Sequence, residues 1–382
     1  MANQYDVLVG GGSIAGLSFA AVAAGRGLSV LVVEEHDKIG EPEKCDGLVS
    51  LRGLKKHGFP PDLGVVQGKV SKGTIHSPGG TVLEIDASRL EVVVLDRGAY
   101  DRQVASSALS AGAEILLGTR VGGVREADDS VSVSAGDRTL RASYYVDATG
   151  PASAPKSGII PSAKYEVEAE WVPEGSVDVF LDAVKYPGFF SWSISCGHSL
   201  AKVGAAGRGI NPSRALDSFL SGREYKLIRK VAAPIYVGGP VESFVEGRRL
   251  LVGESAGMVK PTTAGGITTS LAGGVIAAKW LSETIRSGDP SLLSNYRRDW
   301  VAEFGGDAWR TRRLREAFER LTNAELDSVV SVLSSPSVTA KLAESDFDLH
   351  AAALVSAVGV GGLLKLSRVI ASVEARSLLS GL

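Results

Sequence analysis

The glycine-rich stretch VGGGSIAGLSFA, residues 9–20, constrains the fold of this 382-residue chain more than any other feature. An apolar strand precedes it from residue 5, a run of small residues that predicts a helix follows, and a second apolar strand, LSVLVVEE, comes next. The helix is expected to end at the glycines of GRG, residues 25–27. Strand, glycine loop, helix and strand make one βαβ unit, which begins a parallel, doubly wound sheet with a dinucleotide site at the loop.

Three consecutive glycines leave two possible registers for this loop, and an acidic residue decides between them. The carboxylate that binds the ribose in such folds closes the second strand about 20 residues after the loop, and Glu34 stands at that distance from Gly11. Gly10 is then the last strand residue and the loop runs from Gly11 to Gly16. Gly11 should make the tight turn, Gly16 should let helix and strand approach, and Ser13 should turn outward or cap the helix. The free N–H groups at the helix start would face a pyrophosphate.

The rest of the chain alternates between segments of this kind and strand-rich segments. A hairpin is expected around Pro78-Gly79-Gly80, and alternating apolar and polar residues between 165 and 206 predict an antiparallel sheet. The last hundred residues are mainly helical in pattern. We therefore expect three parts: a discontinuous dinucleotide-binding domain (residues 1–70, 91–155 and 240–295), an inserted antiparallel-sheet substrate domain (71–90 and 156–239) and a helical C-terminal region (296–382).

Composition argues against several partners and compartments. A net charge of −2 without a long basic block gives no case for nucleic acid. Two cysteines are too few for a secreted disulfide framework, so a cytoplasmic location is expected, with possible contact at the membrane surface. The apolar stretch at residues 351–373 is broken by glycines and charged residues, which predicts a buried or interfacial helix instead of a membrane span. The histidines form no metal-ligand pattern, and no metal is expected.

Two further segments identify the dinucleotide. YYVDATGPAS, residues 144–153, and GRRLLVGESAGMVKPTTAGGI, residues 247–267, resemble the second and third signatures of flavoproteins that hold FAD in an extended form. Glu254 stands where the third signature normally has Asp. The turn Gly265-Gly266-Ile267 would present N–H groups to the flavin ring. Arg97 matches an arginine that such proteins place near the cofactor, although a surface ion pair with Asp101 is the alternative. FAD is therefore the expected cofactor.

The segments EEHDKIGEPEKCDGLVS, KYPGFFSWSIS, AKVGAAG and IYVGGPVESFVEGRRLLVGESAG resemble the geranylgeranyl reductase family, above all its archaeal digeranylgeranylglycerophospholipid reductases. The resemblance implies a Rossmann-like FAD domain of the p-hydroxybenzoate hydroxylase type. It also implies reduction of isolated C=C bonds in geranylgeranyl chains of membrane lipid precursors, by hydride from flavin N5 plus a proton. The FAD contacts that it implies are Ala15, Glu34, Cys45, Asp46, Leu48, Arg97, Val121, Glu254, Gly266 and Ile267.

One motif departs from the family pattern. The family's substrate-domain motif is Y-x-W-x-F-P, whereas this chain has Phe190, Trp192 and Ile194 followed by serine. Phe190 and Trp192, with Cys196 close behind, are candidates for the prenyl pocket, and an ordinary sheet core is the alternative. Cys45 lies within the family's P-x-x-C motif. It is a candidate proton donor or redox-sensitive group beside the flavin, with an inert buried thiol as the alternative. A disulfide between Cys45 and Cys196 also stays open.

Two other functions remain open for the same scaffold. One is an FAD-dependent aromatic hydroxylase or halogenase, although the halogenase motif W-x-W-x-I-P is missing from FSWSIS. The other is a non-catalytic flavoprotein that binds prenyl lipids. No second dinucleotide loop is seen, so the electron donor is expected to bind transiently, as NADPH, ferredoxin or another low-potential donor.

Overall fold

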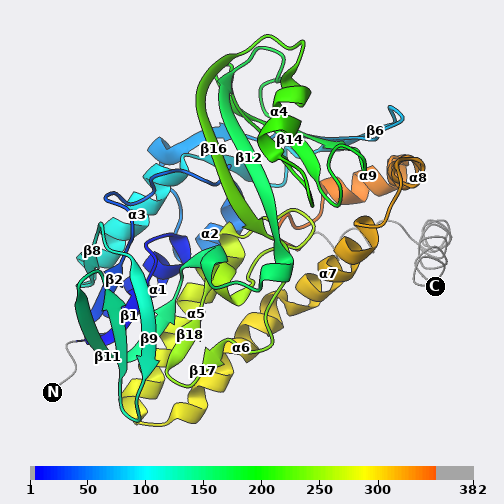
Figure 1. Ribbon diagram of the computed structural model, residues 1–382. Helices are drawn as coiled ribbons and strands as arrows, with labels where there is room; N and C mark the ends of the chain where they lie inside the picture. Colours follow the sequence, from blue (N-terminus) through cyan, green and yellow to red (C-terminus); the bar gives the residue numbers. More distant parts are fainter. Residues whose placement is uncertain (1–4, 350–382) are drawn as a thin grey trace.

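The computed structural model describes residues 5–349 and contains two main β-sheets joined by helices (Figure 1). The first sheet has eight strands, and its central path runs β17-β18-β11-β1-β2-β8. Strands β18, β11, β1, β2 and β8 pair in parallel, whereas β17, β10 and β9 attach as antiparallel neighbours. The strands of this sheet are β1 (Tyr5–Gly10), β2 (Val30–Val33), β8 (Glu114–Leu116), β9 (Val121–Glu126), β10 (Val131–Ala135), β11 (Arg138–Asp147), β17 (Val245–Glu246) and β18 (Arg249–Leu251).

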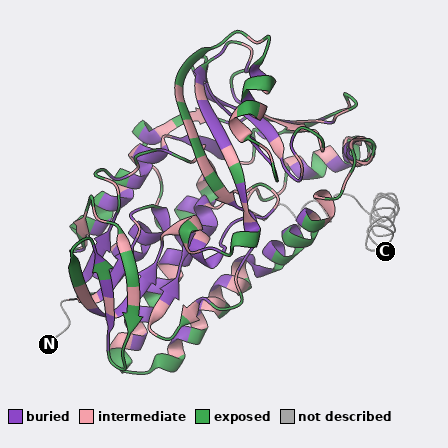
Figure 2. Ribbon diagram, viewed as in Figure 1, coloured by how far each residue is buried: buried purple, intermediate pink, exposed green. Residues whose placement is uncertain are grey.

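Three helices belong to this sheet: α1 (Ile14–Gly25), α3 (Arg97–Ser110) and α5 (Ile267–Ser287). The small residues of α1 allow α5 to come very close, because a Cβ on Gly274 would lie 2.4 Å from the Ala15 carbonyl oxygen. The hydroxyl of Ser18 donates to the Leu271 carbonyl at 3.2 Å and joins the two helices further. Helix α1 and the central strands are buried (Figure 2). This is the predicted Rossmann-like arrangement.

The second sheet has seven strands in the order β16-β12-β15-β14-β13-β5-β6. All neighbours pair antiparallel except β13 and β5, which are parallel. The purely antiparallel expectation is therefore wrong at this one pairing, because the β5–β6 hairpin comes from an earlier part of the chain and docks on the edge of β13. The strands are β5 (Lys72–His76), β6 (Val82–Asp86), β12 (Ile159–Glu168), β13 (Ser176–Leu181), β14 (Phe190–Gly197), β15 (Leu200–Ala206) and β16 (Lys226–Tyr236). Helix α4 (Pro212–Leu220) packs against β12 and β15.

A small third sheet, β3-β7-β4, links the two larger ones. Its strands are antiparallel, and helix α2 (Leu51–Lys56) follows directly after the first of them. The loop that contains Cys45 runs into β3, so this sheet fixes where that loop ends. The strands are β3 (Leu48–Ser50), β4 (Val66–Lys69) and β7 (Val92–Leu95).

The C-terminal helices run from the first sheet to the second (Figure 1). Trp300, at the end of the first of these helices, donates its indole N–H to the Thr269 carbonyl at 3.1 Å and fastens that helix to α5. At the other end α8 and α9 pack on β6, and Asp327 Oδ1 accepts hydrogen bonds from Ser77 and from the Gly79 amide. The elements are α6 (Ser294–Trp300), a π-helical turn (Val301–Gly305), α7 (Gly306–Phe318), α8 (Asn323–Leu333) and α9 (Pro336–Ala343).

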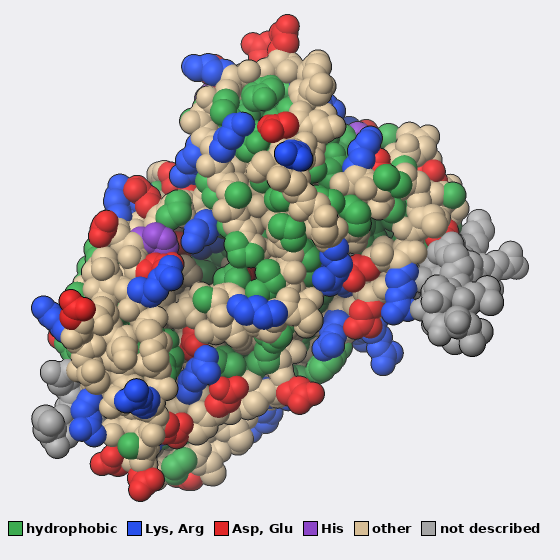
Figure 3. All heavy atoms as spheres, in the orientation of Figure 1, with side chains coloured by type: hydrophobic (Ala, Val, Ile, Leu, Met, Phe, Trp, Pro, Cys, Tyr) green, Lys and Arg blue, Asp and Glu red, His purple; other side chains and the backbone are tan. Residues whose placement is uncertain are grey.

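Acidic and basic side chains are interspersed over the face of the molecule seen in Figure 3. Between residues 5 and 349, no helix is both long and apolar enough to cross a bilayer. The segment 351–373, predicted to be buried or interfacial, lies outside the described residues.

Candidate cofactor and substrate site

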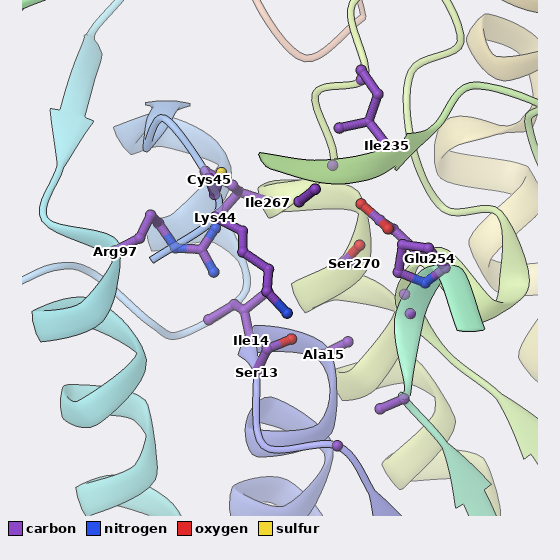
Figure 4. Close-up of a pocket in the computed structure, with 18 of the residues that line it drawn as sticks. Ser13, Ile14, Ala15, Lys44, Cys45, Arg97, Ile235, Glu254, Ile267 and Ser270 are labelled. Atoms are coloured by element: carbon purple, nitrogen blue, oxygen red, sulfur yellow. The ribbon is translucent and has the colours of Figure 1, made fainter. Parts of the chain in front are cut away.

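A cavity of about 1030 Å³ lies where the two main sheets face each other. Its walls come from the start of α1, the loop before β3, the start of α3, the third-signature segment and the inner face of the second sheet. Figure 4 shows Ser13, Ile14 and Ala15 at the tip of α1, with Arg97 and Glu254 on either side of them. Its volume is at the upper end of ordinary ligand pockets, as a large dinucleotide plus a substrate requires.

The glycine loop follows the predicted register. Gly10 ends β1, and Gly11 has a φ of 105°, which an L side chain rarely adopts. A Cβ on Gly11 would lie 2.4 Å from the Ala148 carbonyl oxygen, so the turn also needs the missing side chain. Gly16 does not line the cavity; a Cβ there would lie 2.1 Å from the Gly11 carbonyl oxygen. Gly16 therefore allows the close approach of helix and strand, as predicted.

Ser13 and Glu34 stand where a dinucleotide would be held. Ser13 is the N-cap of α1, but its exposed side chain makes no capping hydrogen bond, so it has turned outward. Glu34 Oε2 accepts a 2.6 Å hydrogen bond from the Gly12 amide, and Oε1 accepts from the His36 amide at 3.0 Å. The start of α1 thus presents amide donors and the positive end of the helix dipole to the cavity, next to a fixed carboxylate.

The third-signature segment brings Glu254 into the cavity wall. Burial raises the pKa of Glu254 to about 7, although the charges of Arg97 and Lys44 act in the opposite direction. Figure 4 shows Glu254 and Lys44 on different sides of the same space. Gly265, Gly266 and Ile267 also line the cavity, and Ile267 is the first residue of α5. The start of a second helix therefore faces the same ligand.

Arg97 combines both roles that the sequence left open. Its guanidinium pairs with Asp101 at 2.8 Å, but both side chains are less than 10% exposed. The alternative of a surface ion pair is therefore wrong in its exposure, because Asp101 follows one helical turn later on the inner side of α3. Arg97 also lines the cavity, and its Nε has no hydrogen-bond partner within the described residues.

An aromatic wall from β14 forms the opposite side. Phe190, Trp192 and Ile194 line the cavity, and the rings of Phe189 and Phe190 stack with centroids 4.0 Å apart. Trp192 is seated tightly, because a Cβ on Gly204 would lie 2.1 Å from its indole ring. These aromatic side chains therefore give the cavity an apolar wall while belonging to a packed sheet, and their role in a prenyl pocket stays a prediction.

Cys196 shares the sheet face of Trp192 but does not line the cavity. It is buried, and burial raises the pKa of its thiol to about 11. Cys45 is half-buried and does line the cavity. Both cysteines are free, so the possible disulfide is not formed. Within residues 5–349, no cluster of three or more His, Cys, Asp or Glu side chains could hold a metal ion.

Two buried lysines beside this loop were not anticipated. Lys164 on β12 donates to the Cys45 carbonyl at 2.8 Å. Lys202 on β15 pairs with Glu43 at 2.8 Å and donates to the Asp46 carbonyl at 3.0 Å. Each lysine stands among apolar neighbours in a strand that reads as buried, and this was the signal in the sequence. The pair fastens the loop before β3 to the second sheet.

Two of the last described residues also line the cavity. Phe347 and Asp348 belong to its lining together with Lys260 and Thr268. Lys260 donates to the Phe347 carbonyl at 3.0 Å, and burial lowers the pKa of its ammonium group. No local pattern pointed to this contact, which joins segments 87 residues apart.

The described residues fit FAD. One cavity is lined by amide donors at two helix starts, by a carboxylate at the end of β2 and by an arginine. Buried polar atoms that have no partner among the described residues remain there, namely Arg97 Nε, Arg249 Nε and Thr268 Oγ1. Of the predicted cofactor residues, all except Gly16 reach the cavity: Gly11, Ser13, Ala15, Glu34, Cys45, Asp46, Leu48, Arg97, Val121, Glu254, Gly265, Gly266 and Ile267.

Comparison with known proteins agrees with this geometry. Residues 6–162 match the family described as FAD dependent oxidoreductase, and FAD is the cofactor. Digeranylgeranylglycerophospholipid reductase 1 of Methanopyrus kandleri is 31% identical over 366 residues, covering 87% of this chain and 94% of that protein. The protein of the same name from Methanococcoides burtonii is 30% identical over 360 residues, covering 86% and 87%.

A solved structure shows the same fold. The geranylgeranyl bacteriochlorophyll reductase-like protein of Thermoplasma acidophilum superposes with a TM-score of 0.85 over 98% of this chain and 99% of that one, at 23% identity. The predicted resemblance and fold class are thereby confirmed. The chain belongs to the geranylgeranyl reductase family of FAD-dependent oxidoreductases.

Proposed function

We propose that this protein is an FAD-dependent reductase that saturates isolated C=C bonds of geranylgeranyl chains in archaeal membrane lipid precursors. The names of the curated relatives support this substrate class. The observation that carries the proposal is one continuous cavity, which joins the glycine loop at Gly11 to the aromatic wall at Phe190 and Trp192. A long apolar chain lying along that wall would bring a double bond to the flavin.

The cofactor-binding roles follow from position. The start of α1, from Ser13 to Ala15, would hold the pyrophosphate, and Glu34 would bind the adenosine ribose. Arg97 and Glu254 would contact the middle of the cofactor, and the start of α5 at Ile267 would lie at the flavin ring. The remaining proposed contacts are Cys45, Asp46, Leu48, Val121, Gly265 and Gly266.

When bound and reduced, FAD supplies a hydride from its N5. An isolated alkene has no carbonyl to take up charge, so a proton must reach the other carbon before or together with the hydride. The aromatic wall excludes water, which would otherwise trap positive charge on the substrate. A proton donor must therefore stand on the cavity wall near the substrate, where Cys45 is the candidate from the sequence.

An anaerobic single-turnover experiment tests this function. The FAD-loaded protein is reduced with dithionite, freed of excess reductant and mixed with a digeranylgeranyl glycerophospholipid in detergent. Flavin reoxidation should accompany a gain of two hydrogens per double bond in the lipid mass. Reoxidation only with oxygen would instead indicate a hydroxylase or halogenase. Lipid binding without either reaction would indicate a non-catalytic flavoprotein.

We further propose a transient electron donor, which could be NADPH, ferredoxin or another low-potential donor. Steady-state reduction of the bound FAD by each donor, followed at the flavin absorbance, distinguishes them. The productive donor should reduce the flavin faster than the lipid-dependent turnover, and a donor that reduces it more slowly is ruled out.

We also propose a cytoplasmic protein with peripheral membrane contact through residues 350–382. This segment contains the apolar stretch 351–373. Deleting it should lower association with liposomes of archaeal lipids in a flotation assay. Undiminished flotation of the deletion variant would overturn this assignment.

A further inference from the structure

We propose that the carboxyl group of Asp46, instead of the thiol of Cys45, donates the proton that completes reduction of the double bond. This inference rests on the proposed function, because it assigns a catalytic residue for that reaction. It adds a chemical role to a residue that sequence resemblance gives only as a cofactor contact.

Asp46 stands where cofactor and substrate would meet. It lines the cavity between Cys45 and Leu48, in the loop that runs into β3. Its Oδ1 is closed off from solvent and has no hydrogen-bond partner among the described residues. The indole N–H of Trp192 is also buried and has no hydrogen-bond partner among the described residues. It lies beside the carboxyl and favours its charged form. Asp46 is thus placed against the aromatic wall that would carry the prenyl chain.

The nearby cations are committed to other acceptors. Lys164 donates to the Cys45 carbonyl and lies 3.5 Å from Glu166. Lys202 pairs with Glu43 and donates to the backbone carbonyl of Asp46, not to its carboxyl. Within residues 5–349, no lysine, arginine or histidine nitrogen forms an ion pair with the Asp46 side chain. The lysines therefore hold the loop in place without fixing Asp46 as a carboxylate.

The electrostatic environment favours a protonated Asp46. Burial raises the pKa of this carboxyl above its ordinary value, and Glu43 acts in the same direction. The charges of Lys164 and Lys202 and the indole of Trp192 oppose that rise without cancelling it. The thiol of Cys196, on β14, is a further titratable group near Asp46. An acid with a raised pKa keeps its proton closer to neutral pH, as a general acid requires.

The step balances with the reductant of the proposed reaction. The Asp46 O–H bond breaks and a C–H bond forms at one alkene carbon. The hydride from reduced FAD supplies the electron pair for the second C–H bond, and the alkene π bond is lost. Asp46 is left as a carboxylate, which takes a proton from water before the next turnover.

The test compares three substitutions in the FAD-loaded protein: Asp46→Asn, Cys45→Ser and, as a matched control, Asp137→Asn. Asp137 is an exposed carboxyl in the turn between β10 and β11 and does not belong to the cavity lining. After anaerobic reduction, D46N should be reoxidised by the lipid about 100-fold more slowly or worse, whereas D137N should keep the full rate. C45S changes a proposed FAD contact, so it should also slow the reaction, but by a much smaller factor than D46N. All three should bind FAD and be reduced by dithionite. A D46N rate within threefold of the unaltered protein, or a C45S loss as large as that expected for D46N, would overturn the inference.

Two readouts separate this inference from the proposed function. The infrared difference spectrum of the unaltered protein minus D46N, both FAD-loaded and at neutral pH, should contain the C=O band of a protonated carboxyl; the subtraction removes the contribution of Glu254, whose pKa burial raises to about 7. Absence of that band from the difference spectrum would overturn the assignment of Asp46 even if lipid reduction occurs. Trp192→Phe removes the N–H beside the carboxyl and should move loss of the band to higher pH; a move to lower pH would contradict the geometry. If the band behaves as expected while no prenyl lipid is reduced, the proposed function is wrong. The assignment of a protonated carboxyl to Asp46 then still stands.

Discussion

The buried ion pair between Lys202 and Glu43 gives the sharpest stability prediction. Lys202 is 3% and Glu43 9% exposed at the side chain, and Lys202 also donates to the carbonyls of Asp46 at 3.0 Å and Leu95 at 3.2 Å. In Lys202→Met the buried carboxylate loses its ammonium partner and both carbonyls lose a donor. Breaking a buried pair on one side costs about 3–5 kcal/mol. Because Arg229 remains 3.3 Å from Glu43 Oε2, we expect Lys202→Met to lower the free energy of unfolding by about 3 kcal/mol, the lower end of this range.

The matched control lies on the same sheet. Lys226 and Glu168 form an ion pair of 3.1 Å whose side chains are 79% and 49% exposed. Lys226→Met should therefore cost about 0–1 kcal/mol. The free energies of unfolding are measured by urea denaturation with tryptophan fluorescence, at one FAD concentration for all variants. Adding Glu43→Gln to Lys202→Met should recover part of the loss, since no charge is then left buried.

The stabilisation by the Lys202–Glu43 pair should also depend on pH in a defined direction. Burial tends to raise the pKa of Glu43, but Lys202 brings that pKa below 4.5. The contribution of Glu43 to the free energy of unfolding is therefore complete above pH 4.5 and is lost as the pH falls. Glu43 holds the pKa of Lys202 above 10.5 despite burial, so this contribution is complete below 10.5 and is lost as pH rises. The difference between the unaltered protein and Lys202→Met should be largest between these values. A cost no larger than that of Lys226→Met, or a difference that grows in acid, would refute the reasoning.

Three further predictions follow from positions around the cavity. Burial raises the pKa of Glu254 from 4.5 to about 7, so between these pH values the folded apoprotein holds a proton that the unfolded chain releases. The free energy of unfolding of the apoprotein should therefore fall by about 3 kcal/mol as the pH rises from 4.5 to about 7. Glu254→Gln should remove this slope in thermal denaturation, and an unchanged slope would contradict it. Gly11→Ala should lower FAD affinity at least about tenfold in a fluorescence titration, because its Cβ would clash with the Ala148 carbonyl. Gly25→Ala is the control: its Cβ would meet nothing nearer than 3.9 Å, and it should raise the free energy of unfolding by about 0.5–1 kcal/mol. Gly204→Ala should displace Trp192 and raise KM for a geranylgeranyl lipid while FAD affinity is kept; an unchanged KM would show that the indole position does not shape the channel.

The sequence was sufficient for the cofactor half of the site. One βαβ unit contains the positive φ at Gly11, the close contact at Gly16 and the carboxylate of Glu34, and these three residues lie within a stretch of 24. Local glycine requirements and strand spacing therefore predicted the register correctly. Arg97 was also recognised, but whether its partner Asp101 would be exposed depended on which side of α3 faces the core.

The substrate half depended on pairings that no local pattern specifies. The parallel contact of β5 with β13 joins residues about a hundred positions apart, and Lys202 reaches Glu43 across 159 positions. Cys196 has the same strand alternation as Trp192, yet only the latter reaches the cavity. Alternation fixes the face of a strand but not how far along that face a ligand extends.

The sequence by itself determined the βαβ unit, the FAD signatures and the family, because these depend on backbone conformations and spacings encoded over short distances. Only the tertiary structure decided that two buried lysines fasten the loop before β3. It also decided that the carboxyl of Asp46, beside Trp192, has no ion-pair partner among residues 5–349. The physical reason is that burial and charge pairing arise where distant segments meet, and those interactions set the protonation of a carboxyl more strongly than its neighbours in the chain do.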